Sequence, residues 1–164
     1  VVGSGVMGHG MTFTFALGGY PTYMHDLNDE TLQRAMKKIK TTADLFVEED
    51  LLTPQQANEA IGRIITTTDL NEAAVNCDFI TEAIVERAED KKVLFNKLDG
   101  ICPPHTILAS NTSGLTLSNF GADVKRQDKL VITHYYSPLT EMYHDRHYSS
   151  QIQSGLQPYC DCNG

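Results

Sequence analysis

The chain has 164 residues, of which 41% are apolar, enough for one sizeable hydrophobic core and one domain by default. Its formal net charge of −8 argues against nucleic-acid and anionic-membrane partners, because both would require clustered Lys and Arg. No segment approaches the roughly twenty apolar residues of a membrane span, and the four cysteines do not form the disulfide framework of a small secreted domain, so we expect a cytoplasmic protein.

A glycine-rich turn follows the first two residues and has the spacing G-x-G-x-x-G. In the dinucleotide-binding fold, Gly3 would form the tight turn, Gly5 would let backbone approach a pyrophosphate, and Gly8 would allow close packing of the next helix. Asp26 ends a strand-like run about twenty residues further on, where this fold places the carboxylate that binds the adenosine ribose hydroxyls. Because a carboxylate repels a 2′-phosphate, these residues predict NAD rather than NADP as the cofactor.

The rest of the chain alternates helical and strand-like patterns. Apolar spacing of three and four predicts a helix over 28–49 with Asn28 or Asp29 as its cap, and Thr53 followed by Pro54 starts a second helix that ends near Gly62. Further expected elements are strands over 63–68, 78–86, 106–110 and 130–134, and helices over 71–75 and 88–98. The pattern predicts an α/β fold of the Rossmann type, with a doubly wound, mainly parallel sheet and flanking helices.

Polar residues follow two of these strands directly. Ser110-Asn111-Thr112-Ser113 and His134 stand at strand ends, and parallel sheets bind ligands at the carboxyl ends of their strands. We therefore expect both stretches to face the same crevice as the glycine-rich turn.

Several separate stretches together resemble the L-3-hydroxyacyl-CoA dehydrogenases of β-oxidation and their 3-hydroxybutyryl-CoA relatives. The matching stretches are Gly3-Ser4-Gly5-Val6-Met7-Gly8, Asp26, Glu82-Ala83-Ile84-Val85-Glu86 with Lys91, Leu108-Ala109-Ser110-Asn111-Thr112-Ser113, and Thr133-His134-Tyr135-Tyr136-Ser137-Pro138. The resemblance covers residues 1–142, which we expect to form one NAD-binding domain.

The resemblance implies NAD-dependent, reversible oxidation of L-3-hydroxyacyl-CoA to 3-ketoacyl-CoA, in fatty-acid β-oxidation or butanoate metabolism. His134 would be the general base and Ser113 would hydrogen-bond the reacting oxygen. The implied cofactor-binding residues are Gly3, Ser4, Gly5, Val6, Met7, Gly8, Asp26, Glu86, Lys91, Ser113 and Ser137. An acyl-CoA substrate, no metal, and a homodimer formed through a C-terminal helical domain are also implied, and that domain is absent from this sequence.

Structural interpretations of these residues remain open. His134 could be a structural residue at a strand end, Ser113 could cap a short helix from Leu115, and Glu86 and Lys91 could form a surface ion pair. Two further functions also remain open, namely a dehydrogenase of a hydroxy acid without CoA and a non-catalytic NAD-binding fragment.

The sequence departs from the family near its end. Position 137 is Ser where the family usually has Asn, and Arg146 stands where a glutamate orients the histidine. Residues 143–164 match no pattern and are expected to be a truncated or mis-sequenced tail; its His and Cys spacings match no common zinc site. The chain also begins without Met, inside the expected first strand, so we expect a clipped N-terminus.

Overall fold

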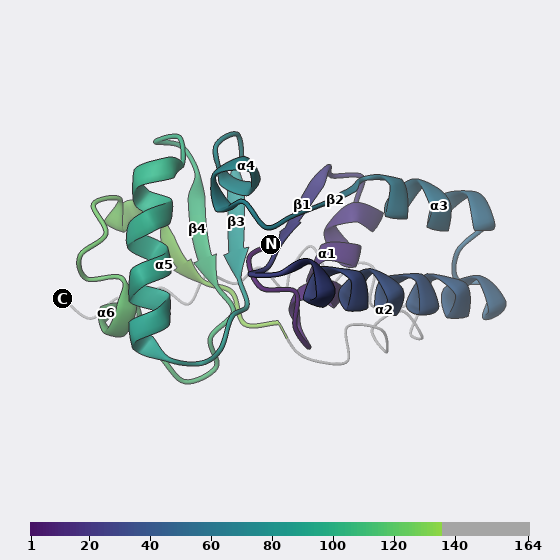
Figure 1. Ribbon diagram of the computed structural model, residues 1–164, viewed down its shortest axis with the longest axis horizontal. Helices are drawn as coiled ribbons and strands as arrows, with labels where there is room; N and C mark the ends of the chain where they lie inside the picture. The colour runs from purple at the N-terminus through teal and green to yellow at the C-terminus, as the bar shows by residue number, and fades with distance from the viewer. Residues whose placement is uncertain (136–164) are drawn as a thin grey trace.

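The computed structural model describes residues 1–135 and contains one parallel sheet with helices around it (Figure 1). The strands are β1 (Thr22–His25), β2 (Ile64–Thr67), β3 (Phe79–Glu82), β4 (Ile107–Ser110) and β5 (Leu130–Ile132). β1 pairs with β2, and β4 pairs with both β3 and β5, all in parallel. Val2 joins the two halves by parallel bridges to His25 and Glu82. The resulting order is β2-β1-Val2-β3-β4-β5, which is the 3-2-1-4-5-6 order of the Rossmann fold.

Six helices connect the strands of the described part. They are α1 (Gly8–Leu17), α2 (Asp29–Glu48), α3 (Pro54–Gly62), α4 (Leu70–Ala74), α5 (Ala88–Ile101) and α6 (Leu117–Phe120), and a 3₁₀ turn covers Gln127–Lys129. The predicted caps of two helices are confirmed: Asn28 accepts from the Thr31 amide, and Thr53 and Gln56 form a capping box. The parallel sheet and the helices between its strands confirm the prediction of a doubly wound α/β fold.

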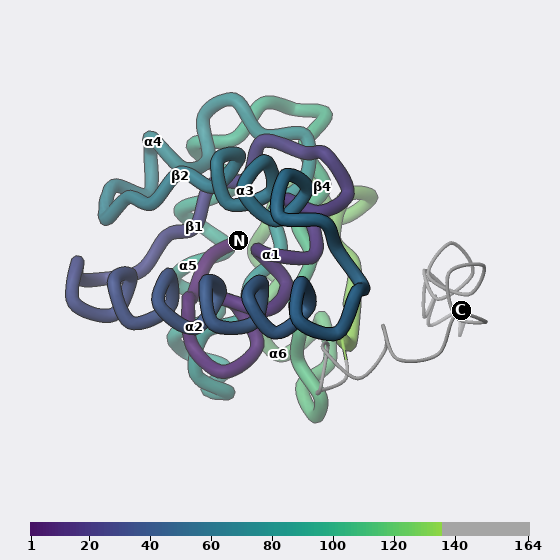
Figure 2. The backbone as a smooth tube through the Cα atoms, turned by 90° about the vertical axis from the view of Figure 1, so that its right-hand side faces the viewer, coloured from purple at the N-terminus to yellow at the C-terminus, as the bar shows by residue number. Residues whose placement is uncertain are grey.

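The core has two parts, one on each side of the central bridge. One part joins α1, α2, α3 and β1 through Phe13, Met24, Ile39 and Phe46, and α2 and α3 lie side by side (Figure 2). The other joins β3, β4, α5 and α6 through Ile80, Phe95, Leu108 and Phe120. The strand order reverses at Val2, which lies between β1 and β3. Folds of this type bind their ligands at this topological switch point, at the carboxyl ends of the strands.

One local expectation and one open alternative were wrong. The strand predicted over 78–86 ends at Glu82, because the Glu82 carboxylate accepts the Ile84 N–H and turns the chain out of the sheet. Ser113 does not cap a helix: α6 begins later, and Thr116 caps it in a capping box with Asn119. In residues 1–135, no helix is long and apolar enough to cross a membrane.

Candidate dinucleotide site

The glycine-rich turn has the geometry that its spacing predicted. Gly3 has φ +94°, and a Cβ there would lie 2.6 Å from the Ala83 carbonyl oxygen. A Cβ on Gly8 would lie 1.7 Å from the Gly3 carbonyl oxygen, whereas a Cβ on Gly5 would meet nothing within 4 Å. Gly3 and Gly8 are therefore needed by the fold itself, and Gly5 leaves open space at the N-terminal end of α1. That open space is where a pyrophosphate would approach the backbone, so the loop fits a dinucleotide.

Asp26 is tied to the same turn. Its Oδ2 accepts the Ser4 N–H at 2.8 Å and the Ser4 hydroxyl at 2.6 Å, and its Oδ1 accepts the Leu27 N–H at 2.7 Å. Burial acts to raise the pKa of Asp26, but the hydrogen bonds from Ser4 and Leu27 outweigh it and hold the pKa below its usual value. The carboxylate is therefore ionised and held at the glycine-rich turn.

Three exposed apolar side chains lie on loops that follow strands of the sheet. Val6, Leu27 and Val85 are 76%, 87% and 60% exposed, and they follow the first strand segment, β1 and β3 respectively. Solvent-exposed apolar side chains near a glycine-rich turn could pack against the face of a flat aromatic ring such as adenine. Of the three residues, only Val6 was predicted from the sequence to contact the cofactor, and the position of Leu27 directly after Asp26 was a usable signal for a second candidate.

The loops after β4 and β5 are held next to each other. The Thr133 amide donates to the Ser110 carbonyl at 2.9 Å, and the Tyr135 amide donates to the Asn111 side chain at 2.7 Å. Ser113 and His134 are both exposed on these adjacent loops. The structure thus brings the two predicted catalytic residues to neighbouring strand ends, and it adds Asn111 as the side chain that fixes the backbone beside His134.

Glu86 and Lys91 contact each other at the boundary of the core, where the Glu86 side chain is 42% exposed. The Lys91 ammonium lies 3.1 Å from Glu86 Oε2 and is also bound by Glu82; the Lys91 side chain is only 1% exposed. The ion pair of the structural alternative therefore exists, but only its Glu86 half is exposed, and the Lys91 half is buried. Sequence reasoning missed Glu82, although a carboxylate inside an apolar strand was the signal that a buried partner must exist.

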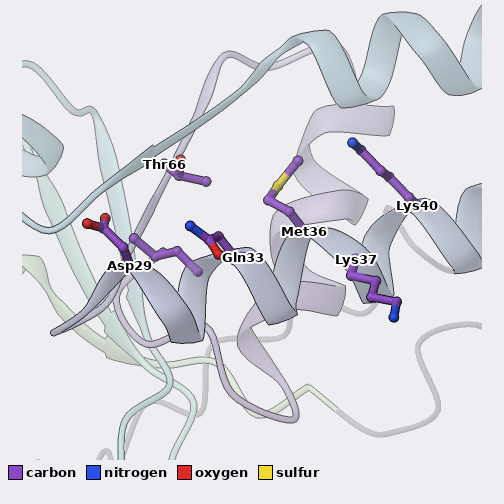
Figure 3. A pocket seen from close by; sticks show the side chains of 7 residues that line it. Asp29, Gln33, Met36, Lys37, Lys40 and Thr66 are labelled. Atoms are coloured by element: carbon purple, nitrogen blue, oxygen red, sulfur yellow. The ribbon is translucent and has the colours of Figure 1, made fainter.

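A groove of about 410 Å³ lies between α2 and β2 (Figure 3). Its lining includes Gln33, Met36, Lys37, Lys40 and Thr66, and none of the predicted site residues. The Lys37 and Lys40 side chains point in different directions and do not converge on one point (Figure 3). Residues 1–135 contain no cluster of His, Cys, Asp or Glu that could hold a metal ion, and Ser137 and Arg146 lie outside the described residues.

The fold and the turn define a Rossmann-type dinucleotide-binding domain. The family described as "3-hydroxyacyl-CoA dehydrogenase, NAD binding domain" matches residues 1–143, and the chain belongs to this family. The predicted resemblance is therefore confirmed, and the cofactor of the family is NAD.

Individual relatives agree with this assignment. The chain is 36% identical over 142 residues to the "Probable 3-hydroxybutyryl-CoA dehydrogenase" of Bacillus subtilis, covering 87% of this chain and 49% of that protein. The structure of 3-hydroxybutyryl-CoA dehydrogenase from Escherichia coli matches with a TM-score of 0.82 at 32% identity, over 85% of this chain and 29% of that one. A diketoreductase structure, whose title names dicarbonyl compounds, matches with a TM-score of 0.78 at 28% identity, over 84% of this chain and 49% of that one. The chain thus spans half or less of the length of these relatives.

Proposed function

We propose that this chain is the NAD-binding part of an enzyme that reversibly oxidises L-3-hydroxyacyl-CoA to 3-ketoacyl-CoA. The observation that carries the proposal is that the adjacent Ser113 and His134 loops and the open turn at Gly5 all follow the carboxyl ends of strand segments in one parallel sheet. A cofactor turn and two proton-handling side chains at one edge of a sheet are the elements of a dehydrogenase site.

Each residue has a separate task in this proposal. Asp26 binds the adenosine ribose, and the turn from Gly3 to Gly8 holds the pyrophosphate. The His134 imidazole takes the proton of the substrate hydroxyl, and it returns this proton when the ketone is reduced. The Ser113 hydroxyl accepts from the alcohol or donates to the ketone, so it orients the reacting oxygen in both directions. Bound NAD⁺ supplies the acceptor for the hydride that leaves the carbinol carbon.

The names of the relatives support acyl-CoA as the substrate class. A homodimer formed through a further domain and a cytoplasmic location remain predictions. The domain boundary at residue 142 likewise remains a proposal, and the family match supports it by ending at residue 143. A second candidate is a dehydrogenase of a hydroxy acid without CoA, which would reduce the corresponding carbonyl compound in the reverse direction. The similarity to a diketoreductase whose title names dicarbonyl compounds favours it.

A titration of this chain with NADH, monitored by the fluorescence of the cofactor, tests the proposed cofactor-binding role of Asp26. We expect Asp26→Asn to reduce the preference for NADH over NADPH by at least about tenfold, because the variant loses the negative charge that repels a 2′-phosphate. Asp44→Asn, which changes an exposed carboxylate on α2, is the matched control and should leave the preference unchanged. Equal preference in the wild type and the Asp26→Asn variant would contradict the assignment.

NADH oxidation with acetoacetyl-CoA tests the reaction, with a dicarbonyl compound without CoA as the competing substrate. We expect His134→Gln to lower kcat by about 10²-fold or more, since general base catalysis contributes on that order. Turnover that is unchanged by His134→Gln would remove the proposed base. Turnover with the simple dicarbonyl and not with acetoacetyl-CoA would favour the second candidate.

A further inference from the structure

Glu82 and Lys91 form a completely buried ion pair under the candidate site. The Lys91 ammonium lies 2.7 and 2.8 Å from the two Glu82 carboxylate oxygens, and the side chains are 1% and 0% exposed. The Ser110 hydroxyl donates to Glu82 Oε2 at 2.5 Å, and Ser110 is also fully buried. Within the described residues, these are the only buried Glu and Lys.

Glu86 connects this pair to the loop that carries Ser113. Its Oε2 lies 3.1 Å from the Lys91 ammonium. Its Oε1 accepts the Thr112 hydroxyl, the Ser113 N–H at 3.1 Å and the Gly114 N–H at 3.2 Å. The loop after β4 is therefore wrapped around one carboxylate oxygen, and the other oxygen is anchored to a buried cation.

The charge state of Glu86 agrees with this geometry. Burial acts to raise the pKa of Glu86, but the hydrogen bonds from Thr112, Lys91 and Gly114 and the Lys91 charge outweigh it and lower the pKa to about 2. Glu86 therefore stays ionised, and it accepts from the loop as a carboxylate, which is a stronger acceptor than a neutral group.

A buried ion pair is a weak source of stability, because desolvation offsets much of the attraction between the two charges. An apolar pair of similar size would fill the same space at no greater cost. The Glu82–Lys91 pair differs from an apolar pair in that it presents a cation, at a fixed point, to Glu86.

We propose that Glu86 is a positioning residue for Ser113, and that Lys91, fixed by Glu82 and Ser110, holds the Glu86 carboxylate against the Thr112–Gly114 loop. The role in the reaction rests on the proposed function of Ser113. In this arrangement Lys91 affects the loop only through Glu86. Its ammonium is buried and contacts Glu86 Oε2, whereas the loop amides bind the other oxygen of that carboxylate.

Amide hydrogen exchange in this chain tests the loop contact without requiring turnover. We expect Glu86→Ala to speed exchange at the Ser113 and Gly114 amides by at least about tenfold, and Glu86→Gln, which keeps an acceptor oxygen, by less than about threefold. Glu89→Gln, an exposed acid in the first turn of α5, is the matched control and should change neither amide. Exchange in Glu86→Ala within about twofold of the wild type would overturn the proposal.

The role of Lys91 is tested in a double variant that removes both buried charges, Glu82→Gln with Lys91→Met, so that no unpaired charge is left in the core. We expect the pKa of Glu86, followed by the NMR signal of its carboxyl carbon, to rise toward the usual 4.5 while the chain stays folded. An unchanged pKa of Glu86 in a folded double variant would overturn the anchoring role.

Kinetics at saturating NADH test the positioning role. Glu86→Ala should lower kcat with acetoacetyl-CoA by at least about tenfold, and Glu86→Gln, which keeps an acceptor oxygen for the loop, by less than about threefold. An equal loss of kcat in the two variants would contradict the positioning role. The exchange data decide the loop contact whether or not the wild type shows turnover, so the two proposals fail separately.

Discussion

Two alanine substitutions in the same turn should have opposite consequences, because only one of them meets protein atoms. In Gly8→Ala the new Cβ would lie 1.7 Å from the Gly3 carbonyl oxygen and 2.7 Å from its carbon, and real Cβ contacts are essentially never closer than 3.0 Å. The obstructing atoms are backbone, so no side chain can move aside and the start of α1 must shift away from the first strand segment. Such overpacking costs typically about 1–3 kcal/mol and occasionally more, and we expect the upper end, about 3 kcal/mol.

Gly5→Ala should leave the fold intact, since its Cβ would meet nothing within 4 Å and its φ is not positive. We expect its free energy of unfolding to stay within about 1 kcal/mol of the wild type, whereas its NADH affinity should fall at least about tenfold, or ~1.4 kcal/mol. Urea unfolding measures the first quantity, and a slope of about 2 kcal/mol/M turns 3 kcal/mol into a midpoint shift of about 1.5 M for Gly8→Ala. The reasoning is refuted if Gly8→Ala unfolds at the wild-type midpoint, or if Gly5→Ala binds NADH as tightly as the wild type.

Two further predictions concern stability. The Arg126 guanidinium pairs with Asp99 at 2.7 Å and donates to three backbone carbonyls at the C-terminal end of α5, so Arg126→Met should lower the free energy of unfolding by about 3 kcal/mol, measured by urea unfolding. Lys125→Met, an exposed neighbour, is its control, and equal midpoints would contradict the prediction. His25 is 6% exposed and burial holds its pKa below the usual 6.5, so the unfolded chain binds more protons below that pH. The free energy of unfolding should therefore fall as the pH drops through about 6.5, and His25→Gln should flatten that part of the profile; an identical profile in this variant would exclude His25 as the cause.

The helix starts could be predicted because their signals are local. Asn28 and Thr53 accept from amides three residues further along, and a cap of this kind depends on a few consecutive residues only. The glycine spacing was equally informative, because Gly3 and Gly8 are required by contacts within and next to the turn itself.

The end of β3 could not be predicted, because it depends on a partner in another element. The run from Phe79 to Val85 is apolar apart from Thr81 and Glu82, and apolar residues alone predict a longer strand. Lys91 was misleading for the same reason: a lysine near a helix start is usually exposed, and only the buried carboxylate from β3 makes its burial possible. The cofactor turn was therefore predictable from sequence, whereas the ion pair beneath Ser113 required the tertiary structure.

The hydrogen bonds of Asp26 limit how a ribose can bind to it. A carboxylate has about four lone-pair positions, and Oδ2 already accepts both the N–H and the hydroxyl of Ser4, while Oδ1 accepts one N–H from Leu27. One position on Oδ1 is therefore available to a first ribose hydroxyl. A second hydroxyl has to replace the Ser4 hydroxyl, which can rotate away, and cannot replace the Ser4 N–H, which the turn fixes. Ser4 thus keeps the carboxylate oriented through its backbone while its side chain occupies the position that the ligand takes, and Asp26→Asn retains this anchor because the amide oxygen still accepts from the backbone.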